Sequence, residues 1–421
     1  MNVGLILNMN KYNKYSFAAL VGALETDERL IDIPLFLVQN NLIRDINDAL
    51  KQFDRVIVCY SFMSPQALSV YYEIKRLRSL FGNKIFLIAG GSYPTGDPNG
   101  ALKMGFDICV VGEGEKTFPE LVYRIVNGKE YEDLPGIGFK CGESIKINKA
   151  SDIVDINLYP PFGIKHKLFA PIEISRGCPW SCKFCQTPRI FGFHIRHRSV
   201  ECVVKYTRVA VNNGYKNFWF ISPNAFAYGS PDGKEVAPDK IKVLLSSLRN
   251  VNGVEKVFFG TFPSEVRPDF VTSEVLDLVT RYASNTSIVI GAQSGSDRLL
   301  KLSGRGHSVN DVYKAVDLTL SAGLTPNLDF IFCLPDENEE DLDRTKSVVE
   351  EFVKKGARIH AHVFIPLHGT PYQNEKPKML DKETRRWLSN LAKRGVVEGY
   401  WSQHIKFGKD ILKFNKLIRE I

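Results

Sequence analysis

The first 130 residues alternate short apolar runs with segments in which apolar residues recur at helical spacing. The apolar runs predict buried strands at residues 3–8, 31–38, 56–61, 84–89 and 108–111. Helices are predicted between and after these strands, at residues 15–24, 43–53, 65–81 and 116–127. This alternation predicts an α/β fold with a doubly wound, Rossmann-like parallel sheet, which binds ligands at the carboxyl ends of its strands.

Residues 131–169 show little periodicity and are rich in proline and glycine, which predicts a linker. The alternation then resumes, with strands predicted at residues 172–175, 216–221, 256–260, 287–290, 327–333 and 361–364. Five helices are predicted between them, at residues 199–213, 237–248, 273–283, 310–322 and 339–355. This pattern predicts a partial (β/α)6 barrel with its chemistry at the carboxyl ends of the strands. We therefore expect domains at 1–130 and 170–372, and a C-terminal helical extension at 373–421 that packs on the open side of the barrel.

The composition is typical of a large globular enzyme: of 421 residues, 44% are hydrophobic and 24% are charged. Because the sequence has no run of 18 apolar residues and no signal-like start, we expect a cytoplasmic protein without a membrane partner. The eight cysteines lack the spacing of a disulfide framework, which favours a reducing compartment. The net charge of +8 is spread along the chain, which favours a solvated basic surface over nucleic-acid binding.

Three cysteines, Cys178, Cys182 and Cys185, form a C-x3-C-x2-C run. Thiolates are the ligands of iron-sulfur clusters, and three of them leave one iron of a four-iron cluster open for a cofactor or substrate. A zinc site that adds His194 or His197 is the alternative. The other five cysteines are scattered and are expected to be small buried hydrophobes.

The cysteine run, with an aromatic residue before its last cysteine, resembles the signature of the radical SAM enzymes. Turns after later predicted strands resemble that family too: residues 291–296, with Gln293 in place of glutamate, 330–338 and 364–371. The resemblance implies that the cysteines hold a [4Fe-4S] cluster whose open iron binds S-adenosylmethionine (SAM), with Phe184 near the adenine. The other SAM contacts expected at strand ends are Ser222, Asn224, Ser264, Glu265, Arg267, Gln293, Ser294 and Leu367.

Glu265 and Arg267 have a second interpretation, as an ordinary surface ion pair. His368 has two interpretations as well: a proton donor or acceptor, or a structural residue of a tight turn. The basic run at residues 194–199 meets either corrin carboxamides or phosphate, or solvent.

The glycine-rich strand ends of the first domain, placed before the cysteine run, resemble the cobalamin-binding class of radical SAM enzymes. Taken alone, these glycines are also consistent with plain turns. The histidine that ligates cobalt in other cobalamin domains has no counterpart after the first strand, where Met9 and Tyr12 are positional candidates. The cobalamin contacts expected are Met9, Tyr12, Ser61, Phe62, Met63, Gly90, Gly91, Ser92, Tyr93, Thr95, Gly112, Glu113, Gly114 and Glu115.

The resemblance implies a cobalamin-dependent radical SAM C-methyltransferase that moves a methyl group from methylcobalamin to an unactivated carbon. Its expected partners are an electron donor of ferredoxin or flavodoxin type and a protein or small-molecule methyl acceptor, with a glutamine residue of methyl-coenzyme M reductase as the substrate suggested by similarity to archaeal members. A cobalamin-dependent radical cyclase or rearrangement enzyme is the alternative. A zinc- or cobalamin-binding module without catalysis is the alternative from another class.

Overall fold

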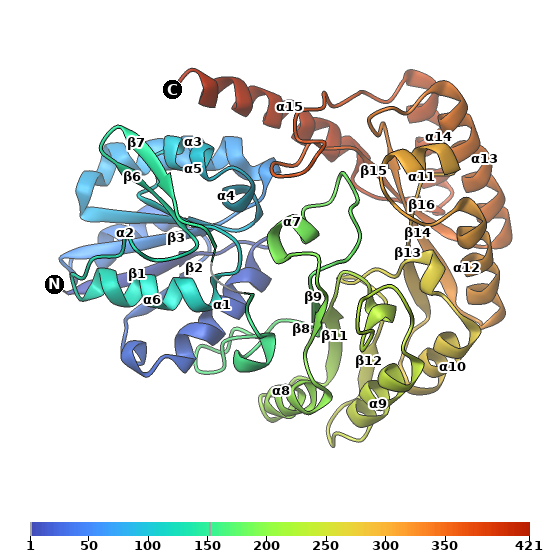
Figure 1. Cartoon of the computed structure of the whole chain (residues 1–421), viewed down its shortest axis with the longest axis horizontal. Coiled ribbons are helices and arrows are strands. Elements are labelled where there is room, and N and C mark those ends of the chain that lie inside the picture. The colour runs from blue at the N-terminus through green and yellow to red at the C-terminus, as the bar shows by residue number, and fades with distance from the viewer. Residues whose placement is uncertain (1, 151–152) are drawn as a thin grey trace.

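The computed structural model describes residues 2–150 and 153–421, which form two α/β parts side by side (Figure 1). The first is a seven-stranded sheet in the order β2-β1-β3-β4-β5-β6-β7. Its strands are β1 (Val3–Asn8), β2 (Leu35–Val38), β3 (Arg55–Ser61), β4 (Ile85–Gly90), β5 (Ile108–Val110), β6 (Ile137–Cys141) and β7 (Ser144–Ile147). The first five are parallel, so the predicted doubly wound arrangement is confirmed.

Helices cover both faces of this sheet, and each face has its own apolar core. On one face lie α1 (Lys14–Thr26) and α6 (Gly114–Val126); on the other lie α2 (Leu42–Ala49), α3 (Ala67–Phe81) and α5 (Pro98–Met104). The short helix α4 (Ser92–Gly96) follows β4 directly. Strands buried on both faces read as continuous apolar runs, which is why β3 and β4 were recognisable in the sequence.

The segment 131–169 differs from the unstructured linker that we expected. Its first part forms β6 and β7, an antiparallel hairpin that extends the sheet beyond β5. Three consecutive residues of β6, Ile137 to Phe139, are buried, whereas β7 is a mostly exposed edge strand. The hairpin was missed because its short edge strand carries polar residues and its flanks are rich in turn-forming residues.

The second part is the partial barrel that the sequence predicts (Figure 1). Its six strands are β8 (Ile172–Glu173), β11 (Asn217–Ile221), β12 (Lys256–Phe258), β13 (Ser287–Gln293), β14 (Thr325–Phe332) and β15 (Arg358–Val363). Around them lie α8 (Val200–Asn212), α9 (Pro238–Arg249), α10 (Ser273–Tyr282), α11 (Asp297–Leu302), α12 (Val309–Ser321) and α13 (Glu339–Lys355). The strands form two sheets, β12-β11-β8 and β13-β14-β15-β16, where β16 (Val397–Glu398) comes from the C-terminal extension. The two sheets are joined where the Val289 N–H donates to the Gly260 carbonyl at 2.9 Å.

The cysteine run lies between the first two barrel strands. A short antiparallel pair, β9 (Ser175–Arg176) and β10 (Arg196–His197), brackets it, and α7 (Thr187–Phe191) follows its last cysteine. Short 3-10 turns lie at Glu28–Leu30, Ser64–Gln66, Gly82–Lys84, Ile156–Leu158, Ala225–Ala227 and Pro268–Phe270.

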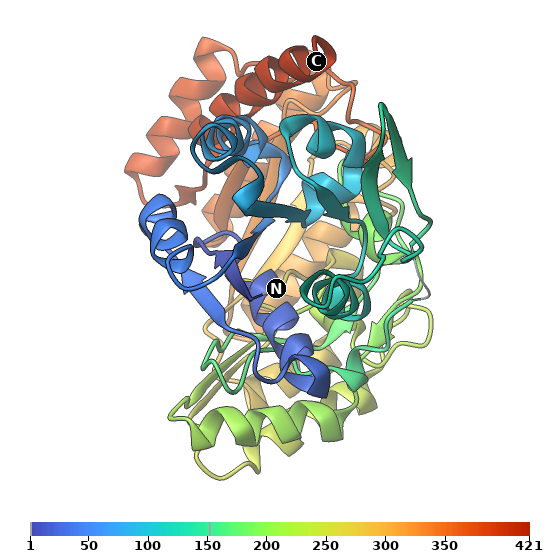
Figure 2. The same ribbon diagram turned by 90° about the vertical axis from the view of Figure 1, so that its left-hand side faces the viewer.

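The C-terminal extension connects the two parts. It consists of α14 (Lys382–Lys393), β16 (Val397–Glu398) and α15 (Trp401–Arg419), and β16 pairs in parallel with the edge of β15. The helix α15 runs from the barrel across the N-terminal part (Figures 1 and 2), where Phe414 and Ile418 join a core that includes Tyr71 and Tyr93. In residues 2–150 and 153–421, no helix is both long and apolar enough to cross a membrane.

Candidate active site

A cavity of about 370 Å³, here called the N-terminal cavity, lies at the carboxyl edge of the first sheet. Its lining comes from the segments that follow β1, β3, β4 and β5. Of the residues expected to contact cobalamin, Tyr12, Ser61, Phe62, Met63, Gly90, Gly91, Ser92, Gly112, Glu113, Gly114 and Glu115 line it. The fold therefore gathers four strand-end turns, which are far apart in the sequence, around one space.

Three of the expected cobalamin contacts serve the fold instead. Met9 is buried in the core on the α1 face. The hydroxyl of Tyr93 donates to Asp97 at 3.0 Å, and the Thr95 hydroxyl accepts from the Gly112 N–H at 3.1 Å. These contacts position the turns and do not support direct roles in binding.

The turn after β4 is shaped for a ligand that approaches the backbone closely. Gly91 has φ +94° and ψ −169°, a region that is essentially restricted to glycine. The Ser92 hydroxyl beside it is buried and has no hydrogen-bond partner among the described residues. A buried hydroxyl without a partner is costly, so this lining fits a ligand with polar groups such as the cobalamin side chains.

Replacing Gly91 by alanine is expected to lower the free energy of unfolding by about 1–3 kcal/mol. A Cβ there would lie 2.8 Å from the Ser61 hydroxyl and 2.9 Å from the Phe62 nitrogen, in a backbone conformation that alanine avoids. Gly90→Ala is the matched control, because its Cβ would meet no heavy atom closer than 3.8 Å. Thermal unfolding of both variants without cofactors checks this; equal stability would contradict it.

A second cavity, of about 500 Å³ and here called the barrel cavity, lies at the carboxyl ends of the barrel strands. The last residues of four strands line it: Glu173, Ile221, Gln293 and Val363. The three cysteines of the loop after β9 also line it, together with Phe184. The structure thus brings the predicted cluster ligands to the end of the barrel where such enzymes place their chemistry.

The cysteine loop is held in place by its surroundings. Gly177 has φ +83°, and a Cβ there would lie 2.1 Å from the His194 carbonyl oxygen. Burial raises the pKa of the Cys178 thiol to about 11 and also raises the pKa of Cys185. An Arg305 Nη1 lies 3.8 Å from the Cys182 sulfur, so a buried cation is available to offset the negative charge that bound thiolates would bring.

The spacing of the three cysteines favours a cluster over a single zinc ion. Zinc bound at about 2.3 Å from each sulfur needs sulfurs about 4 Å apart. Within the described residues, the set of histidine, cysteine and carboxylate groups whose ligand atoms all lie within 4.8 Å does not include these cysteines. The three sulfurs therefore do not all lie within 4.8 Å of one another, which fits a four-iron cluster better than one zinc ion.

Of the expected SAM contacts, Phe184, Ser222, Glu265, Arg267, Gln293 and Leu367 line the barrel cavity. Ser264, Ser294 and Asn224 are engaged elsewhere. Ser264 donates to the Phe220 carbonyl at 2.7 Å, the Ser294 hydroxyl accepts from Ser296 N–H at 3.1 Å, and the Asn224 oxygen accepts from Arg267 N–H at 3.3 Å. These three residues support the turns of the barrel edge.

Arg267, which the sequence predicted as a SAM contact, is engaged by protein groups instead. Its guanidinium pairs with Asp269 at 2.9 Å and donates to the Arg305 carbonyl at 2.8 Å. It also stacks on Trp180, with 3.6 Å between the guanidinium carbon and the ring centroid. Because Trp180 follows Cys178 in the loop, Arg267 positions the cysteines.

Arg305 is the cation that the sequence did not reveal. It lines the barrel cavity, donates to the Gly291 carbonyl at 2.8 Å, and leaves its buried Nε without a partner among the described residues. A Cβ on Gly291 would lie 2.4 Å from Arg305 Nη2 and 2.7 Å from a Glu265 carboxylate oxygen. This cradle of cation, carboxylate and glycine backbone fits the carboxylate and ammonium of an amino acid such as the methionine part of SAM.

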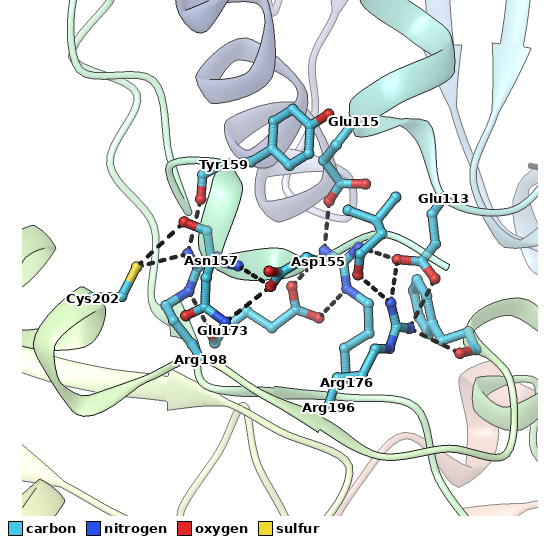
Figure 3. A network of polar contacts seen from close by, with 12 residues as sticks. Glu113, Glu115, Asp155, Asn157, Tyr159, Glu173, Arg176, Arg196, Arg198 and Cys202 are labelled. Carbon is cyan, nitrogen blue, oxygen red and sulfur yellow. Dashed lines mark hydrogen bonds and ion pairs between the residues drawn. The ribbon is translucent and has the colours of Figure 1, made fainter. Parts of the chain in front are cut away.

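The two cavities meet at Glu173, Arg176, Phe191 and Ile221, each of which lines both. Figure 3 shows the polar network at this junction. Arg176 contacts Glu113 at 2.7 Å and both Glu115 and Glu173 at 2.6 Å. The junction therefore links the glycine-rich turn after β5 to the strand that precedes the cysteine run.

The basic run at residues 194–199 belongs to this same junction. Arg196 pairs with Glu113 at 2.8 Å, and Arg198 donates to the carbonyls of Glu173 and Tyr159 at 3.0 and 2.8 Å (Figure 3). These contacts join the two parts of the chain and favour a structural role over the cofactor contacts that we considered.

His368 also joins the two parts of the chain. It is buried, Nδ1 lies 3.0 Å from the Ser64 hydroxyl, and Nε2 lies 2.9 Å from the Asn415 oxygen. Burial lowers the pKa of His368, so its neutral form is favoured. The structural interpretation of this histidine is therefore the better supported one.

Comparison with known proteins agrees with this architecture. Residues 15–122 match the model of the B12 binding domain, and residues 172–349 match that of the Radical SAM superfamily. An uncharacterized methyltransferase of Pyrococcus horikoshii is 24% identical over 397 residues, covering 90% of this chain and 78% of that protein. A putative methylthiotransferase of Methanocaldococcus jannaschii is 29% identical over 319 residues, covering 73% and 68%.

Two solved structures share the fold. The cobalamin-dependent S-adenosylmethionine radical enzyme OxsB aligns with a TM-score of 0.67 and 17% identity over 94% of this chain, which spans 62% of OxsB. The radical S-adenosylmethionine methyltransferase TsrM from Kitasatospora setae aligns with a TM-score of 0.68 and 16% identity, covering 89% of this chain and 77% of TsrM.

A radical SAM domain implies a [4Fe-4S] cluster and SAM, and a B12 binding domain implies cobalamin. The cysteines with Arg305 fit the cluster and SAM. The N-terminal cavity, with the unpartnered Ser92 hydroxyl, fits cobalamin. The chain thus consists of an N-terminal B12 binding domain followed by a radical SAM domain.

Proposed function

We propose that this protein is a cobalamin-dependent radical SAM methyltransferase that transfers a methyl group to an unactivated carbon. The observation that carries the proposal is the junction of the two cavities, which share four lining residues. Cofactors bound at the facing strand ends of the two parts would have their reactive groups close to one substrate. The methyltransferase names of the Pyrococcus horikoshii relative and of TsrM add support.

When bound, the cluster with SAM supplies hydrogen abstraction from carbon, and methylcobalamin supplies the methyl group. Cys178, Cys182 and Cys185 would hold the cluster, while Arg305 and Glu265 would orient the amino-acid end of SAM. Gly90 and Gly91 have no side chains, so they would let the cobalamin side chains lie close to the backbone. Arg176 with its three carboxylates would hold the two parts of the chain together where the cavities meet.

The acceptor stays a prediction: a protein side chain or a small molecule, of which a glutamine residue of methyl-coenzyme M reductase is the example raised by the sequence. An electron donor of ferredoxin or flavodoxin type is proposed with it. A methylthiotransferase activity, suggested by the names of several relatives, is less well supported. Residues 1–130 contain only Cys59 and Cys109, both buried in strands of the first sheet, and so offer no second cysteine cluster.

Anaerobic reconstitution with iron, sulfide and cobalamin, followed by turnover with SAM, a reductant and candidate acceptors, tests the proposal. We expect a methylated acceptor together with both 5'-deoxyadenosine and S-adenosylhomocysteine. The nucleoside alone, with a rearranged substrate, would replace the methyltransferase by a cyclase or rearrangement enzyme. Zinc without sulfide in the protein would point to the non-catalytic module.

A further inference from the structure

Strands β14 and β15 bring three side chains of metal-ligand type together inside the barrel. Asp329 on β14 is in register with His360 on β15, and His362 lies two residues further, so both histidines are on the same face of β15. Asp329 Oδ1 lies 2.9 Å from His360 Nδ1 and 3.7 Å from His362 Nε2. The ligand atoms of all three residues lie within 4.8 Å of one another.

This cluster opens on the barrel cavity. Asp329 and His362 line that cavity, and the side chains of His360 and His362 are 29% and 26% exposed. The Asp329 side chain is only 8% exposed, and in the described part of the chain its ion pairs are with the two histidines, not with lysine or arginine. A buried carboxylate normally has a cation as its partner, and a metal ion held by the two imidazoles would be such a cation.

We propose that Asp329, His360 and His362 bind a divalent transition-metal ion such as Zn²⁺ or Fe²⁺, separate from the cysteine-bound cluster. Two imidazole nitrogens and one carboxylate oxygen form the ligand set of catalytic zinc sites and of non-haem iron sites, both of which keep open positions. Ligands about 2.0–2.2 Å from one metal ion lie roughly 3–3.5 Å apart. The observed separations of 2.9 and 3.7 Å bracket that range.

The surroundings suit a site with an open position facing the cavity. His404 of α15 stacks on His362 with 5.2 Å between ring centroids, and its Nδ1 accepts the Val363 N–H at 3.3 Å. The stacked ring of His404 limits rotation of the His362 ring, which keeps His362 beside Asp329. Because Asp329 and His362 line the barrel cavity, an open position of the ion would face an oxygen or nitrogen of a molecule held there.

Metal binding can be measured without turnover, so its outcome does not depend on the proposed methyl transfer. The parent protein is the full chain with Cys178, Cys182 and Cys185 changed to alanine, which removes the competing thiolates. Titration with Co²⁺ as a spectroscopic substitute for zinc is expected to give one ion per chain, with d–d bands of nitrogen and oxygen ligands and no thiolate charge-transfer band. The same titration on wild-type protein with its cysteines occupied by a cluster keeps the test valid if the triple variant does not fold.

Adding His362→Ala or Asp329→Asn to the parent is expected to weaken Co²⁺ binding by about 100-fold or more. Loss of a residue that only hydrogen-bonds a metal ligand already lowers metal affinity by about 10–100-fold. His194→Ala, which removes an exposed histidine near the cysteine loop, should leave the affinity unchanged. Stoichiometric Co²⁺ binding that survives both ligand variants would overturn the proposal. Folded parent protein that binds no Co²⁺ would also overturn it and would show that Asp329 and His360 form only a hydrogen-bonded pair.

Discussion

Replacing any one of Cys178, Cys182 and Cys185 by alanine is expected to abolish 5'-deoxyadenosine formation, down to the level of a protein-free control. Each cysteine supplies one of the thiolates around the barrel cavity, and the three leave no spare sulfur ligand in the loop. A two-thiolate site cannot retain a four-iron cluster that needs three protein ligands and one open iron. Iron, sulfide and nucleoside content after anaerobic reconstitution measure the loss.

Cys141→Ala is the matched control for these variants. Cys141 is an exposed thiol at the end of β6, in the N-terminal sheet and away from the cysteine loop. It should keep wild-type iron and sulfide content and full nucleoside formation. A loop variant that retains both the cluster and the nucleoside would remove the basis for a radical SAM site at these residues.

Local patterns in the sequence were sufficient to recognise most elements and the turns that form the two cavities. The helix predicted at 339–355 coincides with α13, because Asn338 and Asp341 form a capping box and Gly356 ends the helix in the left-handed region. Ser199, the first residue of the helix predicted at 199–213, is the N-cap of α8. Cys333 and Asp336, in the turn at residues 330–338, have φ of +61° and +66°, in the left-handed region that favours glycine.

What the sequence could not show are contacts between segments far apart in the chain. Arg305 reaches Cys182, 123 residues away, and Arg176 reaches Glu113, 63 residues away. The pairing of Asp329 with His360 depends on the register of β14 and β15. Periodicity predicts a strand but does not specify its neighbours or register, so these polar partners could be found only in three dimensions.

Arg176→Met is expected to lower the free energy of unfolding by roughly 3–5 kcal/mol, the usual cost of removing one partner from a buried ion pair. The Arg176 side chain is 6% exposed, and it faces Glu113, Glu115 and Glu173, which are 10%, 8% and 19% exposed (Figure 3). Methionine keeps the volume but leaves these carboxylates without their shared cation. Urea denaturation of the cofactor-free chain measures the difference, and Arg176→Lys should lose less because a charge remains.

The pH dependence separates this electrostatic effect from simple loss of packing. Burial acts to raise the pKa of Glu115, but Arg176 outweighs it, so the wild-type carboxyl has a pKa below its usual value and stabilises the fold above the unfolded pKa. Without Arg176 the largest remaining influence on Glu115 is burial, which acts to raise its pKa and makes the variant less stable as pH rises. The difference in free energy of unfolding between wild type and Arg176→Met should therefore be largest near neutral pH. It should narrow as the pH falls through about 4.3, where an ordinary glutamate titrates.

Arg44→Met is the control, because it removes a side chain that is 70% exposed and paired with Asp45. It should change the free energy of unfolding by no more than about 1 kcal/mol at any pH. A gap for Arg176→Met that stays constant with pH would show that packing, and not the charge of Arg176, holds the junction between the two cavities.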